Sequence, residues 1–231
     1  MQFFNKKLLI FDFDGTLIDS VPDLADALNK MLIQLNRKTF DESTIRYWVG
    51  NGAQTLVKRA LLGHSDITDF IEDSKYRDAL AIFLSFYQKN CSKKTSLYPG
   101  VKKTLVNLKK YGYQLTIVTN KPSLFIEPIL HSLGLETLFT LSLGGDSLDE
   151  KKPSPKPLLY ICNKLQYSLE ETLMIGDSKN DIIAANSANI QSVAVSYGYN
   201  YGEDISNYNP TVIIDDFQEL SSLLGQEDAK K

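Results

Sequence analysis

The stretch LLIFDFDGTLIDS, residues 8–20, determines how the fold is interpreted. Residues 8–13 are an almost continuously apolar run, which is typical of a strand buried in a parallel sheet. Asp12 and Asp14 interrupt the end of this run, and Gly15, which permits a sharp turn, follows at once. Because side chains two positions apart on a strand point the same way, we expect both carboxylates to face one crevice.

The chain from Ser20 to about residue 92 has the pattern of helices. Ser20 is the expected N-cap of a first helix, in which apolar residues recur at helical spacing up to residue 35. A Gly-Asn-Gly break at 50–52 precedes a second helical segment, 53–62, and a longer one follows at 66–91. No convincing strand lies in this region, so we expect an all-helical insert.

After residue 97 strand and helix patterns alternate, which is typical of a parallel α/β sheet with helices on both faces. The expected strands are 114–120, 138–143, 172–176, 192–196 and 212–214, and the expected helices are 101–111, 123–133, 156–165, 179–188 and 217–224. The sequence therefore predicts an α/β protein with a Rossmann-like parallel-sheet core. This core comprises residues 1–16 and 97–231, and a helical domain, residues 17–96, is inserted after its first strand.

Composition narrows the possible partners. The 231 residues carry a formal net charge of -3, whereas nucleic-acid binders are usually basic, so no nucleic-acid partner is expected. No apolar run reaches the ~18 residues of a membrane span, and Asp12 breaks the N-terminal apolar block, which argues against a signal peptide. We expect a cytoplasmic protein without a membrane partner, and either a monomer or a homodimer.

Polar motifs follow four of the expected strands. They are DFDGT after the first strand, Thr119 and Asn120, Lys152 within KKPSPKP, and GDSKND with Asp177 and Asp181. Ligands of parallel sheets bind beyond the carboxyl ends of the strands, so we expect these motifs to meet. Several carboxylates together require a cation; oxygen ligands favour Mg²⁺, and the lack of His and Cys in the motifs argues against zinc.

Such a site suits the transfer of a phosphoryl group. One aspartate can attack the phosphorus, while a second protonates the leaving alcohol and then activates water. Lys152 and the Thr119 hydroxyl can bind the remaining phosphate oxygens. Taken singly, each motif also has a simpler explanation: a strand-end cap for the aspartates, a turn for Thr119-Asn120, and a helix cap for Asp181.

The four motifs, in this order, resemble those of the haloacid dehalogenase superfamily in its phosphatase form, and the insert resembles that family's cap domain. The resemblance implies that Asp12 is the nucleophile and a Mg²⁺ ligand. It implies that Asp14 is the general acid/base and offers its backbone carbonyl to the metal. The remaining implied roles are a phosphoryl site at Thr119 and Asn120, a lysine at Lys152 that pairs with the phosphoryl group and Asp12, and metal binding by Asp177, with Asp181 as a ligand or a support.

Two further stretches resemble the phosphoglycolate phosphatase branch of the family, WVGNGAQTLVKRAL at 48–61 and GGDSLDEKKPSPKPLLYIC at 144–162. This implies a small phosphorylated metabolite, 2-phosphoglycolate, as the substrate. Gly50 and Gly52 form either a plain turn or a loop whose N–H groups approach the anionic substrate. Arg59 either pairs with the substrate carboxylate or lies on a solvated helix face.

Other functions of the same fold stay open. They are a phosphosugar mutase, a pyrophosphatase, a phosphatase of broad specificity and a non-enzymatic regulator. Mutases of this family usually depart from DGT in the first motif, and this sequence does not. Intact carboxylates argue against a regulator without activity.

Overall fold

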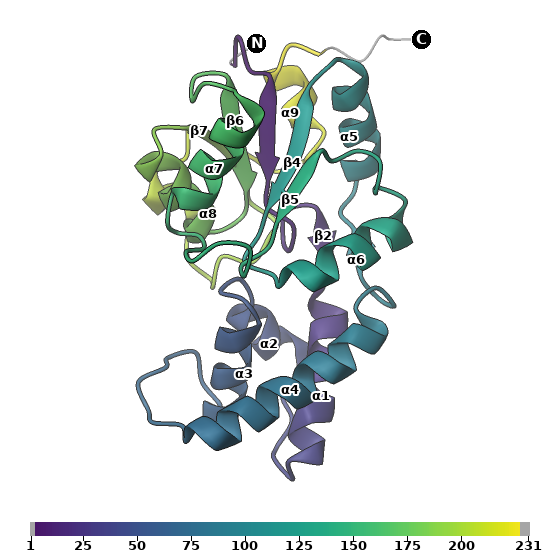
Figure 1. Ribbon diagram of the computed structural model, residues 1–231, viewed down its shortest axis with the longest axis vertical. Helices are drawn as coiled ribbons and strands as arrows, with labels where there is room; N and C mark the ends of the chain where they lie inside the picture. Colours follow the sequence, from purple (N-terminus) through teal and green to yellow (C-terminus); the bar gives the residue numbers. More distant parts are fainter. Residues whose placement is uncertain (1–2, 227–231) are drawn as a thin grey trace.

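The first apolar run forms the centre of a sheet. The computed structural model describes residues 3–226, and in it β1 (Leu8–Phe11) is fully buried between β4 (Gln114–Val118) and β6 (Thr172–Gly176). The complete order is β5-β4-β1-β6-β7-β8, with every pair parallel. The outer strands are β5 (Leu141–Leu143), β7 (Gln191–Val195) and β8 (Val212–Ile214). The predicted parallel α/β sheet is therefore confirmed (Figure 1).

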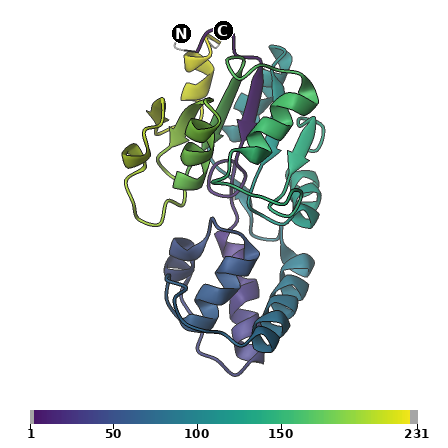
Figure 2. The same cartoon turned by 60° about the vertical axis from the view of Figure 1, so that its left-hand side comes forward.

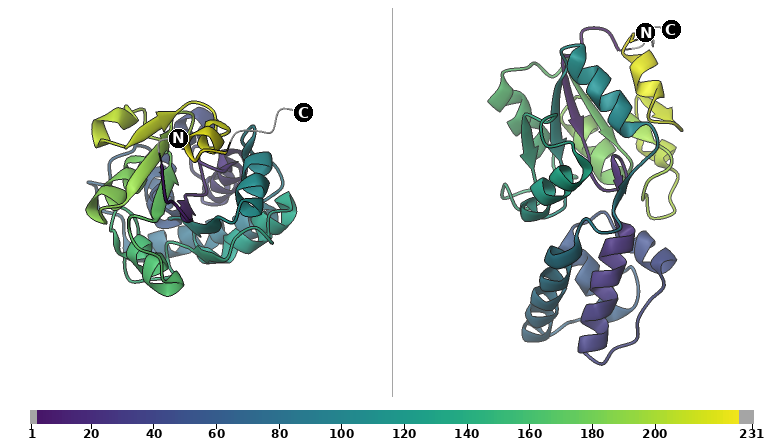
Figure 3. Two further views of the ribbon diagram at one scale, coloured as in Figure 1. Left: turned by 90° about the horizontal axis from the view of Figure 1, so that it is seen from above. Right: turned by 90° about the vertical axis from the view of Figure 1, so that its right-hand side faces the viewer.

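Helices cover both faces of this sheet, as the end-on view in Figure 3 shows. Leu9 and Phe11 pack into the cluster that includes α5 (Val101–Lys110), α6 (Ile126–Leu133) and α9 (Glu219–Leu223). Leu8 and Ile10 pack on the other side with α7 (Lys156–Leu165) and α8 (Lys179–Ser187). Alternate residues of β1 thus serve opposite cores, which explains why its sequence is apolar throughout.

Four helices lie beyond the carboxyl ends of the strands (Figures 1 and 2). They are α1 (Val21–Gln34), α2 (Glu42–Trp48), α3 (Ala53–Leu62) and α4 (Asp73–Asn90). Helix α1 packs against the other three. Buried Asp23 on α1 accepts hydrogen bonds from the backbone N–H groups of Lys94 and Thr95, and so fastens the returning chain to this group.

Some local predictions are wrong, and the reasons are physical. The helix expected from residue 66 begins at Asp73, after a polar stretch without helical structure. Two short antiparallel strands, β2 (Ile18–Asp19) and β3 (Ser96–Leu97), connect the helical group to the sheet; with two residues each they are too short for a recognisable period. In the described part of the chain, no helix is long and apolar enough to cross a membrane.

The start of α1 also differs in detail from the prediction. Ser20 occupies the N-cap position, but its side chain does not cap the helix. Its hydroxyl instead donates a 2.5 Å hydrogen bond to Oδ1 of Asp14. Strand β1 ends at Phe11, so Asp12 and Asp14 lie in the following loop and not on the strand as expected.

Candidate active site

Asp12 is held where β1 ends and the loop begins. Its side chain is almost fully buried; Oδ1 accepts a hydrogen bond from the N–H of Phe13 at 2.7 Å and forms an ion pair with Nζ of Lys152 at 2.9 Å. Two residues on, Gly15 has φ +90°, which allows the chain to turn sharply. The turn brings Gly15 so close to Asp177 that a Cβ there would lie 2.2 Å from Oδ2.

Three buried carboxylates lie together at this point. Oxygen atoms of Asp12, Asp177 and Asp181 are all within 4.8 Å of one another. Asp177 follows β6, and its oxygens accept hydrogen bonds from the Thr16 hydroxyl at 2.7 Å and the Tyr199 N–H at 2.6 Å. The cluster has the all-oxygen donor set that hard divalent cations prefer, so it could hold a metal ion.

Asp181 has a different set of partners. It is the third residue of α8. Its Oδ2 accepts hydrogen bonds from the backbone N–H and the hydroxyl of Ser178, the N-cap residue of that helix. Its Oδ1 lies 2.5 Å from Nζ of Lys152. The helix-cap interpretation and the site interpretation of Asp181 are therefore compatible, because one carboxylate does both.

The electrostatics of the cluster favour a bound cation. Burial, and to a smaller degree the charge of neighbouring Asp181, raise the pKa of Asp12 to about 7, although Lys152 and the Phe13 N–H act in the opposite direction. Burial, together with Asp12 and Asp181, also raises the pKa of Asp177 well above its usual range. Burial lowers the pKa of Lys152, but the two carboxylates outweigh it and raise that pKa overall. Positive charge among these groups would stabilise their ionised forms.

Asp14 has its own cationic partner, which the sequence analysis missed. Nζ of Lys121 lies 2.8 Å from Oδ1 and 3.1 Å from Oδ2 of Asp14, and both side chains are largely buried. Burial lowers the pKa of Lys121, but Asp14 and Tyr87 raise it more, so the lysine stays charged. Lys121 directly follows Thr119 and Asn120 in the sequence, and its position after the end of β4 was the signal that could have identified it.

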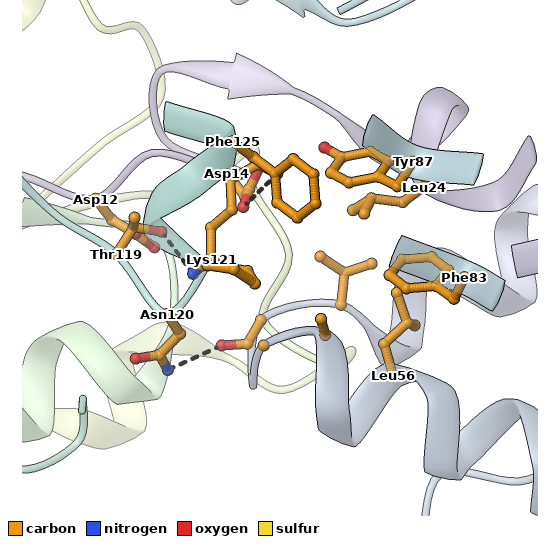
Figure 4. Close-up of a pocket in the computed structure, with 15 residues that line it drawn as sticks. Asp12, Asp14, Leu24, Leu56, Phe83, Tyr87, Thr119, Asn120, Lys121 and Phe125 are labelled. Carbon is orange, nitrogen blue, oxygen red and sulfur yellow. Dashed lines mark hydrogen bonds and ion pairs between the residues drawn. The ribbon is translucent and has the colours of Figure 1, made fainter. Parts of the chain in front are cut away.

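A cavity between the sheet and the helical group joins these residues (Figure 4). From the sheet side it is lined by Asp12, Asp14, Thr119, Asn120 and Lys121. From the helical side it is lined by Leu24, Gly50, Gly52, Leu56, Phe83 and Tyr87, among others. Lys152, Asp177 and Asp181 adjoin Asp12. All nine residues expected at the site are thus brought together.

The loop at 50–52 is bound to the sheet through its carbonyl groups. Nδ2 of Asn120 and Nδ2 of Asn180 both donate to the carbonyl oxygen of Gly50, at 3.1 and 3.2 Å. Nζ of Lys151 donates to the carbonyl oxygen of Asn51 at 2.8 Å. These contacts were not predictable from the sequence, because they join segments far apart in the chain.

Arg59 has neither of the expected roles. Its guanidinium donates to the carbonyl oxygen of Trp48 at 2.7 Å and to Oδ1 of Asn51 at 3.1 Å. It does not line the cavity. Arg59 therefore braces the loop before α3 and is not a solvated side chain.

The contact between Gly15 and Asp177 leads to a test. We expect Gly15→Ala to lower the catalytic rate by ~100-fold, because the new Cβ would displace Asp177. Gly112→Ala is the matched control, since Gly112 has φ +87° but no atom within 4 Å of an added Cβ. Both variants should lose about 1 kcal/mol of stability from the backbone conformation, and equal rates for the two in steady-state assays would refute the proposed clash.

Comparison with known proteins agrees with this geometry. Residues 9–195 match the family model described as haloacid dehalogenase-like hydrolase. The chain is 51% identical to "Phosphoglycolate phosphatase" of Colwellia psychrerythraea over 95% of this chain and 97% of that protein. It is 48% identical to the protein of the same name from Psychrobacter arcticus, over 95% and 96%.

A solved structure is also similar over nearly its whole length. The crystal structure of a "predicted phosphoglycolate phosphatase" from Haemophilus somnus superposes with a TM-score of 0.89 and 40% identity, covering 95% of this chain and 98% of that one. The sequence match, the sheet and the arrangement of the four motifs lead to one conclusion. The chain belongs to the haloacid dehalogenase-like hydrolases.

Proposed function

We propose that the protein is a Mg²⁺-dependent phosphatase that hydrolyses 2-phosphoglycolate to glycolate and phosphate. The observation that carries this proposal is the single cavity onto which both Asp12 and Asp14 open, each paired with its own lysine. Relatives 48–51% identical over nearly the whole chain bear the name phosphoglycolate phosphatase, which supports the choice of substrate.

In the first step, a carboxylate oxygen of Asp12 attacks phosphorus, and the bond from phosphorus to the glycolate oxygen breaks. Asp14 donates its proton to that leaving oxygen. The Thr119 hydroxyl and Lys152 neutralise and orient the transferred phosphoryl group. The product is glycolate, and the enzyme carries a phosphoryl group on Asp12.

In the second step, Asp14 acts as a base. It removes a proton from a water molecule, whose oxygen attacks phosphorus and breaks the bond to Asp12. Phosphate leaves, and both aspartates return to their starting protonation states. Lys121 would hold Asp14 in position in both steps, by a hydrogen bond to the protonated acid in the first and by an ion pair with the carboxylate in the second.

We assign the metal site to Asp12, Asp177 and the backbone carbonyl of Asp14, with Asp181 as a support. Three donors already bind the oxygens of Asp181, against two for Asp177, which favours the supporting role for Asp181. Mg²⁺ held by these residues would supply positive charge that lowers the repulsion between the nucleophile and the phosphate.

The proposed domain division places the helical group at residues 17–96 and the core at residues 1–16 and 97–231. In this division the helical group acts as a cap that selects the substrate. The cavity beneath it is small, with a volume of about 40 Å³. Its wall on the helical side includes Leu24, Leu56 and Phe83, which offer no hydrogen bonds to a sugar or to a second phosphate. These properties favour a short leaving group over a hexose or pyrophosphate.

The test is phosphate release in the presence of Mg²⁺ from 2-phosphoglycolate, pyrophosphate, glucose 1-phosphate, a nucleoside monophosphate and p-nitrophenyl phosphate. We expect the highest kcat/KM with 2-phosphoglycolate. Preference for another ester would reject the substrate but keep the reaction type. No release from any of them would reject the phosphatase.

A further inference from the structure

We infer that Lys121 and the hydroxyl of Tyr87 form a subsite for the carboxylate of the substrate. This inference rests on the proposed function, because it assigns the part of the cavity that would recognise the non-reacting end of 2-phosphoglycolate. That end carries a negative charge two bonds beyond the ester oxygen. A short anionic group of this kind needs donors close to Asp14, where the leaving oxygen is protonated.

Lys121 is the only cationic side chain among the described residues that line the cavity. Its ammonium group is on the same side as Asp14, the proposed proton donor to the leaving group. An ammonium has three N–H donors, and the contacts with Asp14 use the two oxygens of a single carboxylate. Lys121 therefore has capacity to bind a second carboxylate while it holds the first.

Tyr87 supplies an independent sign of a missing partner. It is 1% exposed, and its hydroxyl oxygen is one of the few buried polar atoms in the described residues without a hydrogen-bond partner. Its ring packs between Phe83 and Phe125, which fixes the direction of the hydroxyl. Nζ of Lys121 lies 4.9 Å from the ring centroid, so both donors serve one end of the cavity (Figure 4).

A buried hydroxyl without a partner is costly, and native proteins rarely keep one without a reason. Since Tyr87 lines the cavity, a bound ligand can supply the acceptor. The hydroxyl is a donor to any anion there.

The amino end of α3 lines the same cavity, next to Asn120, and adds to the positive potential there. Gly52 and Ala53 line the cavity, and the helix begins at Ala53 with Gly52 as an N-cap that has no side chain to offer. The first N–H groups of a helix lack partners within the helix and attract anions. No acidic residue lies in the first turn of α3 to occupy them.

The remaining surroundings favour a carboxylate over a larger anion. When Asp14 carries its proton, the charge of Lys121 matches one negative charge on a ligand, and the wall includes the apolar residues Leu24, Leu56 and Phe83. A Cβ on Gly52 would lie 2.8 Å from the carbonyl oxygen of Asn120, so the helical loop approaches the sheet closely. The space therefore suits a methylene group followed by a planar carboxylate.

The test compares two substrates that differ in this group, 2-phosphoglycolate and ethyl phosphate, in the Mg²⁺-loaded enzyme. The measured quantity is the ratio of their kcat/KM values. We expect Tyr87→Phe to lower this ratio by roughly tenfold and Lys121→Met by about 100-fold, as for the loss of hydrogen bonds to a charged group. Tyr98→Phe is the matched control, because it removes another buried hydroxyl without a partner that does not line the cavity.

A purely structural role would lower both kcat/KM values and leave their ratio unchanged. Tyr87→Phe keeps the size of the ring and should fold. It therefore tests the subsite even if Lys121→Met fails to fold. If the wild-type enzyme prefers 2-phosphoglycolate but neither variant changes the ratio, the subsite is wrong while the proposed function stands. A wild-type ratio near one would reject both the subsite and the proposed substrate. If Tyr98→Phe lowers the ratio as much as Tyr87→Phe does, the subsite would also be rejected.

Discussion

Asp12→Asn should reduce phosphate release from every substrate by more than about 10⁴-fold, the order seen when a covalent nucleophile is removed. An amide oxygen is a poor nucleophile, and Asp181, the other carboxylate beside Lys152, does not line the cavity. Residual release is to be measured by a steady-state phosphate assay with enzyme that is free of wild-type contamination.

Asp26→Asn is a suitable control, since it makes the same chemical change at an exposed carboxylate on α1 that pairs only with Lys94. Its activity and its thermal unfolding should match those of the wild type. Substantial turnover by a folded Asp12→Asn protein would overturn the assignment of the nucleophile.

Removal of divalent metal should have an effect of similar size. Treatment with EDTA is expected to silence the enzyme, and added Mg²⁺ should restore it, because buried Asp12 and Asp177 repel each other and the phosphate without a cation. Ca²⁺ should inhibit, since its looser coordination does not hold the geometry of attack.

Thermal unfolding gives a second measurement that does not depend on turnover. Mg²⁺ should raise the unfolding temperature of the wild type, because it binds the folded state. The shift should be smaller in Asp177→Asn, which removes one carboxylate of the cluster. Full activity in EDTA, or identical shifts in the two proteins, would contradict the metal site.

The sheet was predictable from the sequence because its strands are short apolar runs with clear boundaries. The expected bounds of α7, β6 and β8 agree with the structure to the residue. The start of α4 and the β2–β3 pair were not predictable, since the first follows a long polar segment and the second has only two residues in each strand. Local patterns carry little information in both cases.

The residues of the site also divide into those that were predictable from the sequence and those that were not. Asp12, Asp177 and Lys152 were found because each belongs to a motif that follows a strand. Tyr87 and Asn180 were not, since their roles depend on which residues of distant segments they approach, as in the bond from Asn180 to Gly50. Lys121 lay inside a motif, but only the fold reveals that Asp14 is its partner.

The most direct test of the two-step mechanism is a rapid-mixing experiment with Asp14→Asn and p-nitrophenyl phosphate. Nitrophenolate leaves without a general acid, so the first step should proceed, whereas the second lacks its base. We expect a burst of about one nitrophenolate per active site, then slow turnover, with a phosphoryl group found on Asp12 by mass spectrometry. Slow release without a burst and without phosphorylated Asp12 would contradict the account.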